Sequence, residues 1–471
     1  MHIHTRYVLI TVAWLVAIPA ATWVTAAQTS QASPEAVTFH KDVLPIFQEN
    51  CQSCHRPGQI GPFSMLTYKE VRPWARAIKL AVATKRMPPW FADPQYGHFD
   101  NDRSLKQTDI ETVVAWVNGG AAEGDPRDAP PSIRWPEGGW QIQPDVVVEL
   151  PPYPVPAYGV KEWENLAIPA PFARDTWVTS VEILPGQPGL VHHMCFSFEK
   201  HKPTTPYDVY EWMETPRDED GVTKDRSRYS ERGRAGVVVT REVGSTEEQR
   251  RRGRAVIPGG NEFCYLPGLP YEDYRPVDAG AFVPAGSDMT ISIHYTANGL
   301  AAIDRTRIGF TIAKAPPAKR FLPQGGDEID GAPLVRKSRI TELEIPPHES
   351  NYVAPLSEMT FLRDVELVWF RPHAHVRGKS AEYTLFYPDG REEIVLSVPR
   401  YDFNWQLTYR TSLKIPKGSR MEVRFTYDNS SANRQNPNPN KWIYYGDQSW
   451  EEMGTPNVGF LVDNTEQDTP E

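Results

Sequence analysis

Hydrophobic positions in the first quarter of the chain recur at helical spacing. Residues 39–47 look like the start of a helix, residues 74–84 carry apolar side chains at helical intervals, and the segment from Thr108 repeats this pattern up to the pair Gly119-Gly120. Apolar residues at these intervals line one face of a helix. We therefore predict a small all-α domain near the N-terminus.

The pattern changes to alternation from about Val146 onward. Residues 381–398 look like a hairpin that turns at Pro388-Asp389-Gly390, and nothing between residues 146 and 465 predicts a long helix. Alternation places apolar side chains on one face of a sheet. Two all-β sandwich domains would fit this region. The other alternating segments are residues 176–184, 289–294 and 421–427.

Two segments depart from these patterns. Residues 126–145, which follow the helical region, begin rich in Pro and Asp and are typical of a linker. Residues 200–254 are strongly charged and read as a surface insertion within the first β-domain. The domain boundaries that follow are residues 35–125 for the helical domain, residues 146–315 for the first β-domain and residues 316–465 for the second.

The N-terminus predicts export. Residues 7–27 carry no charge, Arg6 precedes them, and small residues stand before Ala26 and Ala27. This is the pattern of a secretory signal peptide over residues 1–27, so the mature protein is expected in the periplasm or outside the cell. The apolar run is also long enough to span a bilayer, so an uncleaved N-terminal helix that tethers the protein is the alternative.

Composition narrows the class of protein. The chain has 471 residues, of which 40% are hydrophobic and 23% are charged, so it is neither a disordered tail nor a membrane bundle. The formal charge of −10 and the lack of a basic block before residues 250–254 give nucleic-acid binding little support. Four cysteines cannot form a disulfide scaffold for a chain of this size.

Cys51, Cys54 and His55 form a C-x-x-C-H motif. Thiols at this spacing form thioethers to the haem vinyl groups, and the next residue supplies an axial imidazole to the iron. A zinc site would need two more ligands at similar spacing, which do not follow, and a redox dithiol would not require the histidine. The motif predicts covalent haem c, and residues 35–125 resemble a small cytochrome c.

The second axial iron ligand is expected to be a methionine in a loop. Met87 fits best, because prolines hold its loop extended and it lies far beyond His55 in the sequence. Met65 lies too close to His55 to reach the opposite haem face easily, and a ligand such as His98 stays open. His40 is expected to be structural.

Histidines also gather in the β-rich region. His373 and His375 are two apart, so on a strand both point to one face, about 6–7 Å from each other, which suits two ligands of one metal. His192 and His193 are adjacent, so they can share a metal only at a bulge or strand end. His294 ends an alternating strand between these pairs. A structural polar pair is the alternative for each pair taken alone.

The order of these clusters is found in a known family. His192-His193-Met194, His294-Tyr295, His373-Ala374-His375 and Glu451-Glu452-Met453 follow one another as in the copper type II, ascorbate-dependent monooxygenases, the family of peptidylglycine α-hydroxylating monooxygenase and dopamine β-monooxygenase. Residues 402–406 also look like a family segment. The resemblance covers about residues 150–465, and with the haem motif the chain resembles bacterial fusions of a cytochrome c with this catalytic core.

The resemblance implies two jelly-roll-like domains, each with one copper ion, that face each other across a cleft. His192, His193 and His294 would hold the electron-storage copper, with His201 as a rival for His294. His373, His375 and Met453 would hold the oxygen-binding copper, and imidazole and thioether ligands suit both copper oxidation states. Met453 as an ordinary loop or core residue is the alternative.

Some positions differ from the family. In the peptide-hydroxylating enzymes an Arg at the place of Arg371 binds the substrate carboxylate, so Arg371 is a candidate substrate residue, with a structural role as the alternative. Thr455 and Asn457 stand where those enzymes use Asn and Tyr, which argues against a peptide ending in glycine. Cys195 and Cys264 can form one disulfide in an oxidising compartment, or stay as free thiols.

The resemblance therefore implies an exported copper monooxygenase. It would hydroxylate a C–H bond of a small-molecule or peptide substrate with O₂. Ascorbate or a periplasmic electron carrier, acting through the haem, would supply electrons. A haem and copper protein for electron transfer or copper handling, without hydroxylase activity, is the alternative. A third possibility is a binding module in which haem is the only redox centre.

Overall fold

The computed structural model describes residues 36–158, 160–201, 263–269, 271–322, 343–446 and 449–464, together with short segments and single residues between these ranges. The predicted signal peptide, residues 1–27, and most of the predicted charged insertion, residues 200–254, lie outside the described residues. The chain divides into two units, Met1–Ala36 and Val37–Glu471, and the second is the one described below. No helix in the described part of the chain has the length and apolar character needed to cross a membrane.

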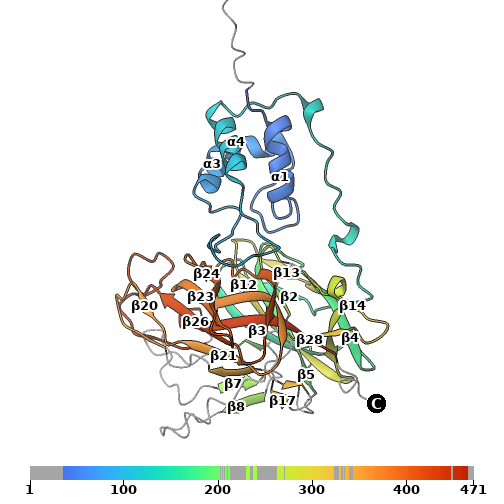
Figure 1. The fold of residues 1–471 in the computed structure, drawn as a ribbon. Helices are drawn as coiled ribbons and strands as arrows, with labels where there is room; N and C mark the ends of the chain where they lie inside the picture. The colour runs from blue at the N-terminus through green and yellow to red at the C-terminus, as the bar shows by residue number, and fades with distance from the viewer. Residues whose placement is uncertain are drawn as a thin grey trace, which may run out of the picture. The chain divides into compact units, whose positions relative to one another are not determined.

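Short helices form the first part of this unit (Figure 1). Prolines and caps explain where they begin: Pro45 opens α1, where a missing N–H costs no hydrogen bond, and Thr67 forms a capping box with Glu70 at α2. The helix predicted from Thr108 begins one residue earlier, at Gln107, and Lys106 before it makes no side-chain cap bond. The helices are α1 (Leu44–Asn50), α2 (Tyr68–Val71), α3 (Ala75–Ala83) and α4 (Gln107–Asn118), with a π-helical turn at Phe39–Val43 and 3-10 turns at Arg72–Trp74, Pro126–Asp128, Glu137–Gly139 and Arg275–Val277.

The helices enclose a small core of their own. Ile110, Val113 and Trp116 recur three residues apart on α4, and all three are buried. Phe39 packs against Phe47 and Trp116, with ring centroids 6.3 Å and 6.0 Å away. The C-x-x-C-H motif follows α1 directly, since Cys51 is the residue that ends this helix.

The remainder of the described chain is mostly β-sheet, as the alternating pattern predicts. The largest sheet has nine strands in the order β1-β14-β4-β11-β15-β28-β22-β25, and β10 pairs with β4 outside this path. Its strands are β1 (Val146–Glu149), β4 (Thr176–Leu184), β10 (Tyr271–Asp273), β11 (Ala279–Val283), β14 (Arg307–Ile312), β15 (Lys319–Leu322), β22 (Val365–Ala374), β25 (Tyr409–Ile415) and β28 (Gly454–Asp463).

Two further sheets complete the layers. One has five strands in the order β6-β3-β12-β5-β9, and the other has six, in the order β18-β21-β26-β23-β24 with β20 beside β26. Their strands are β3 (Val160–Pro169), β5 (Val191–Lys200), β6 (Glu211–Trp212), β9 (Phe263–Tyr265), β12 (Ser287–Thr296), β18 (Val335–Ser338), β20 (Tyr352–Val353), β21 (Ser357–Phe361), β23 (Gly378–Phe386), β24 (Glu392–Val398) and β26 (Arg420–Tyr427). The two-stranded pairs are β2 (Tyr153–Val155) with β13 (Ala302–Asp304), β7 (Ser230–Gly233) with β8 (Val237–Thr240), β16 (Glu328–Ile329) with β17 (Ala332–Pro333), and β19 (Glu344–Ile345) with β27 (Ile443–Tyr444).

The nine-stranded sheet takes part in two hydrophobic cores. Its first strands and the five-stranded sheet enclose one core, which includes Ile308 and Phe310. Its last strands and the six-stranded sheet enclose the other, which includes Leu367 and Phe460. A parallel pair, β11 with β15, joins the two halves of the sheet. The predicted hairpin is confirmed, because β23 and β24 pair antiparallel on either side of Gly390.

A segment between α3 and α4, residues 89–103, packs on the second β-core, and we call it the strap. Phe91 and Phe99 belong to that core. The backbone N–H of Asp93 donates to the carbonyl of Ser397 at 2.8 Å, and the side chain of Asn101 donates to the carbonyl of Thr408 at 2.8 Å. The helical part and the second β-core are therefore joined by buried side chains as well as by the chain itself.

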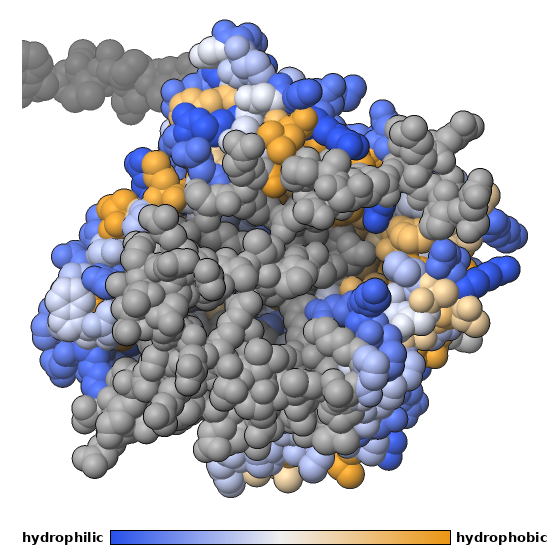
Figure 2. Space-filling view, turned by 90° about the horizontal axis from the view of Figure 1, so that it is seen from below, coloured by the Kyte–Doolittle hydropathy of each residue, from blue (hydrophilic) through white to orange (hydrophobic). Residues whose placement is uncertain are grey.

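Hydrophilic residues predominate among the coloured residues on the face shown in Figure 2, and the hydrophobic ones occur in small groups. Some large exposed hydrophobic side chains in the described chain come from separate elements, for example Leu80 on α3 and Val147 on β1. Tyr158 and Leu300 are exposed on two neighbouring loops, joined by a hydrogen bond from the Gly299 N–H to the Ala157 carbonyl. Single exposed apolar residues are ordinary on soluble proteins. The candidate metal-binding residues are instead found among the polar side chains in and near the β-cores.

Candidate metal centres

The first cluster brings together three histidines from two neighbouring strands. His192 and His193 lie on β5 and His294 lies on β12, and one ring nitrogen from each falls within 4.8 Å of the others. His294 is paired with His193, but Tyr295 is paired with Val191, so His192 is an extra residue. This is a β-bulge, the irregularity that two adjacent histidines need to share one metal.

The imidazoles of this cluster are held neutral. Burial lowers the pKa of His192 and of His294 to about 4, and it lowers the pKa of His193 well below its usual value. The Nδ1 atoms of His192 and His193 lie 3.0 Å apart, so at least one of them carries no proton. Neutral imidazole is the form that binds metals.

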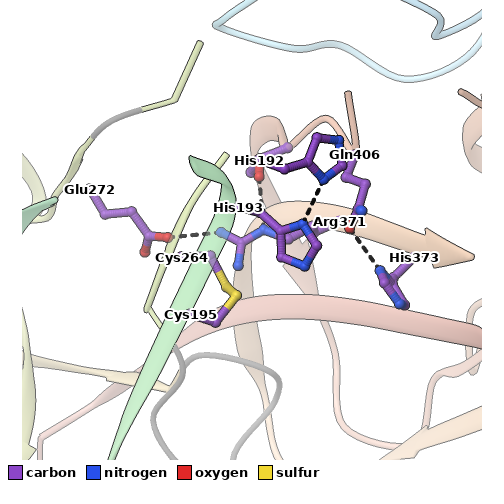
Figure 3. The surroundings of a disulfide bond; sticks show 9 residues. His192, His193, Cys195, Cys264, Glu272, Arg371, His373 and Gln406 are labelled. Carbon is purple, nitrogen blue, oxygen red and sulfur yellow. Dashed lines mark hydrogen bonds and ion pairs between the residues drawn. A yellow bond between two sulfur atoms is a disulfide. The ribbon is translucent and has the colours of Figure 1, made fainter. Parts of the chain in front are cut away.

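The second cluster lies at the end of β22. His373 is the ninth residue of this strand and His375 follows it directly, with ring centroids 5.2 Å apart. Nδ1 of His373 lies 2.8 Å from Oε1 of Gln406, and Nδ1 of His375 lies 3.3 Å from the carbonyl oxygen of Glu451. Figure 3 shows the contact between His373 and Gln406. Since both oxygens only accept, each Nδ1 carries the proton, so each Nε2 carries the lone pair that a metal would bind.

Glu452 connects Met453 to this cluster. Its buried carboxylate accepts hydrogen bonds from the backbone N–H groups of His375, Arg377 and Met453, at 2.8, 2.6 and 3.2 Å. Met453 immediately precedes β28, and the pairing of β28 with β22 runs up to Gly454 beside Ala374. The strand pairing and the shared carboxylate therefore set Met453 beside His375. Burial raises the pKa of Glu452 to about 7, against these hydrogen bonds.

One turn, residues 402–406, contacts both clusters. The ring of Phe403 lies 5.5 Å from that of His192, 6.5 Å from that of His294 and 6.1 Å from that of His375. The backbone of Asn404 is hydrogen-bonded to His192, and Gln406 binds His373. His373 and His375 also contribute to lowering the pKa of His193. The five histidines therefore form two adjacent clusters around Phe403.

Arg371 lies in the sheet beside the second cluster. Its guanidinium donates to Oε1 of Glu272 at 2.8 Å and to the hydroxyl of Thr408 at 2.9 Å, and it stacks on Trp369. The side chains of Arg371 and Glu272 are 4% and 8% exposed, so the pair is buried. Its charge is therefore compensated within the protein, which supports the structural role and leaves substrate binding as a prediction.

Cys195 and Cys264 form the disulfide that the sequence allows. They are directly paired across β5 and β9, two residues beyond His193 (Figure 3). The bond ties β9 to the strand that carries two histidines of the first cluster. The alternative of two free thiols is therefore wrong.

The C-x-x-C-H motif forms a compact loop after α1. The thiols of Cys51 and Cys54 are free, and burial with the nearby Cys54 raises the pKa of Cys51 to about 12. Nδ1 of His55 lies 3.1 Å from the carbonyl oxygen of Phe63, which leaves Nε2 for a metal. A Cβ at Gly61 would lie 2.7 Å from the carbonyl oxygen of Cys54, so only glycine allows this approach. Met87 is half-buried in the loop after α3.

The rival ligands lie elsewhere. Met65 is buried in the core of the helical part, and its carbonyl accepts from Gln52. His98 is exposed, and His40 lies 3.5 Å from Glu123. His201 binds Asp288, with ring nitrogen and carboxylate oxygen 3.1 Å apart, outside the first cluster.

Sequence reasoning missed the acceptors behind the second cluster. Gln406 and Glu452 carry no motif of their own, although both stand inside segments that the family resemblance singles out. Gln406 has a positive φ of 42°, and a glutamine in this strained backbone region is a signal only the structure reveals. Glu272, the partner of Arg371, has no signal in the sequence.

Comparison with known proteins adds little. No family model and no curated protein matches the chain. Among solved structures, a chain from the structure of infectious bursal disease virus strain Gx is 6% identical, and the match covers 70% of this chain and 76% of that chain with a TM-score of 0.16. The N-terminal tandem CBM22 domain of a Paenibacillus barcinonensis protein is 10% identical over 64% of this chain and 79% of its own, with a TM-score of 0.14. Likenesses this weak carry no argument about function.

Proposed function

We propose that the chain is an exported copper-dependent monooxygenase that hydroxylates a C–H bond of an organic substrate with O₂. One oxygen atom would enter the substrate and the other would leave as water, with two electrons and two protons consumed. The convergence of five histidines from β5, β12 and the end of β22 around Phe403 carries this proposal. In the same proposal, the strands form two jelly-roll-like domains, and residues 35–125 form a cytochrome c domain.

The donor atoms fit copper. His192, His193 and His294 offer three neutral imidazoles, and His373, His375 and Met453 offer two imidazoles and a thioether. This mixture suits an ion that changes between Cu(II) and Cu(I). When bound, copper would supply one-electron redox chemistry and O₂ activation, and haem c at Cys51, Cys54, His55 and Met87 would supply electron transfer.

The chain's own groups have defined tasks in this scheme. Gln406 and the carbonyl of Glu451 hold a proton on Nδ1 of His373 and His375, which aims each Nε2 at the metal. Glu452 fixes His375 and Met453 on one carboxylate. Phe403 contacts a ring of each cluster, 5.5 Å from that of His192 and 6.1 Å from that of His375.

Metal and haem content of the exported protein tests the proposal. We expect about two coppers and one covalent haem per chain, O₂ uptake that depends on an organic substrate, and loss of one copper in His375→Ala and in His193→Ala. The control is His348→Ala, which removes a histidine outside both clusters. A protein that binds copper and haem but takes up no O₂ with any substrate would be the electron-transfer or copper-handling alternative. Full copper content in His375→Ala would contradict the site.

A further inference from the structure

Residues 68–87, which include α2 and α3, carry an excess of positive charge, and we call them the basic segment. They contain six basic residues and one acidic residue, Glu70, in a chain whose formal charge is −10. Arg72 and Lys79 bind neutral partners, the carbonyl of Gly120 and the side-chain oxygen of Asn118, at 3.2 and 2.8 Å. The other four are exposed and form no ion pair within the described part of the chain: Lys69, Arg76, Lys85 and Arg86. The basic segment therefore presents positive charge to solvent.

Large apolar side chains are exposed on the same segment. Trp74 is 46% exposed in the turn before α3, and Leu80 is 57% exposed on α3. Arg76 and Leu80 are four residues apart and share the outer face of this helix. Ile78 and Val82 are buried on its other side. Exposed aromatic and arginine side chains close together are typical of a surface that binds another protein.

Ring contacts connect Trp74 to the C-x-x-C-H motif. The indole of Trp74 stacks on Phe63, with ring centroids 4.6 Å apart and an interplanar angle of 13°. The ring of Phe63 lies 4.9 Å from that of His55, and the Phe63 carbonyl oxygen lies 3.1 Å from Nδ1 of the same histidine. His55 is the proposed axial ligand of the haem iron. A single side chain therefore separates this ligand from an exposed aromatic ring.

We propose that the basic segment is the docking face for a small acidic electron-carrier protein, with Trp74 at the point where the electron enters. This inference rests on the proposed function, because it names the class of donor that would serve the haem. One electron would pass from the reduced carrier to ferric haem iron, which becomes ferrous, while the carrier is oxidised by one electron and no atom or proton moves. Opposite charge steers such a carrier to this face and raises its association rate. A surface of anionic lipid would match the charge too, but it would not need ring contacts that lead to His55.

Reduced rubredoxin, a small acidic protein with one redox-active iron, is the probe. Rapid mixing without O₂ follows reduction of the haem in the full chain by absorbance. We expect the second-order rate constant at low ionic strength to fall about tenfold in Arg76→Glu and in Lys85→Glu, and this difference to shrink as salt is added. Trp74→Ala should lower it about tenfold, and Trp74→Phe should restore most of it, since phenylalanine keeps a ring against Phe63. Lys314→Glu reverses an exposed charge in the β-sheet part, and this matched control should leave the rate constant nearly unchanged.

Two further measurements separate docking from damage to the haem site. Hexaammineruthenium(II) is a small cationic reductant, so Arg76→Glu should reduce at least as fast with it as wild type does. The haem absorbance spectrum of Trp74→Ala should match that of wild type, because His55 keeps its place. Calorimetry with oxidised rubredoxin measures binding without electron transfer, and the Kd should rise about tenfold in Arg76→Glu.

Equal rates of reduction by rubredoxin in wild type, Arg76→Glu and Lys85→Glu would overturn the inference. Binding to phosphatidylglycerol vesicles that is lost in Arg76→Glu, while rubredoxin reduces all variants alike, would overturn it as well, because the face would then serve a membrane. Either result leaves the copper and haem content as proposed. A chain that holds neither copper nor covalent haem would refute the proposed function itself.

Discussion

Hydrogen-bond acceptors behind the histidines set which ring nitrogen is available. In the second cluster both Nδ1 atoms face oxygens, those of Gln406 and of the Glu451 carbonyl, so Nδ1 carries the proton on each ring and Nε2 carries the lone pair. In the first cluster two Nδ1 atoms face each other at 3.0 Å instead. The Nδ1 atoms of the two clusters therefore have different neighbours, oxygens in the second cluster and another ring nitrogen in the first.

Gln406 gives the sharpest test at this scale. Gln406→Leu removes the acceptor of the His373 proton, so the ring loses its fixed orientation and tautomer. We expect copper affinity at the second cluster to fall by about 10–100-fold, measured by competition with a Cu(I) chelator. Gln406→Glu keeps an acceptor oxygen and should bind nearly as tightly as wild type. Equal affinity in Gln406→Leu would show that the hydrogen bond does not orient His373.

Local pattern explains much of the secondary structure, and pairing between distant segments explains the rest. Alternation around residues 381–398 is enough to predict the β23–β24 hairpin, and the spacing of His373 and His375 places them together at the end of β22. Adjacent residues of a regular strand point to opposite faces, so His192 and His193 can face one metal only if the strand has a bulge. The Gln406–His373 contact joins residues 33 apart, and the Arg371–Glu272 pair joins residues 99 apart. The spacing of hydrophobic residues cannot predict contacts between residues so far apart in the sequence, because these contacts depend on how the strands of the whole sheet are arranged.

Glu182 shows how one buried side chain makes a sheet sensitive to pH. It lies on β4, and its carboxylate accepts hydrogen bonds from the backbone N–H groups of Gln141 and Ile142, at 2.6 and 2.8 Å. Burial raises the pKa of Glu182 to about 7 despite these bonds. The folded state therefore holds its proton more tightly than the unfolded state, and this stabilisation is present at acidic pH and lost as the pH rises through about 7.

We expect Glu182→Gln to remove this part of the pH dependence. Glutamine keeps an acceptor oxygen for Gln141 and Ile142 and does not titrate. The free energy of unfolding, measured in urea from pH 5 to pH 8, should fall more steeply for wild type than for the variant. The comparison cancels the contribution of Glu452, which also titrates with a pKa raised to about 7 and is present in both proteins. Identical slopes would mean that Glu182 keeps its ordinary pKa in the folded state.

At the scale of the molecule, the helical part is joined to the β-sheet part both by the linker at residues 126–145 and by contacts of the strap. The strap brings Phe91 and Phe99 into the second core, and its backbone pairs with Ser397 and Arg410. The same stretch of the second core, around Thr408, also holds Arg371 beside the second cluster. We therefore expect a substitution in the strap to alter the packing of the β-core close to the candidate metal ligands.

Phe99 is the residue through which this link can be measured. Its ring lies 5.5 Å from that of Tyr409 and 6.4 Å from that of Phe370, and it is 9% exposed. Phe99→Ala should lower the free energy of unfolding of the β-core by about 3–5 kcal/mol, because it leaves a cavity among these rings. Hydrogen exchange should also become faster along residues 89–103, where the backbone would lose its anchor.

Leu80→Ala on the outer face of α3 serves as the comparison, because Leu80 is 57% exposed and lies outside the buried core. It should change stability by no more than about 0.5 kcal/mol. Urea unfolding and amide exchange of both variants separate the two cases. If Phe99→Ala behaves as Leu80→Ala does, the Phe99 ring contributes no more to the stability of the β-core than an exposed side chain does.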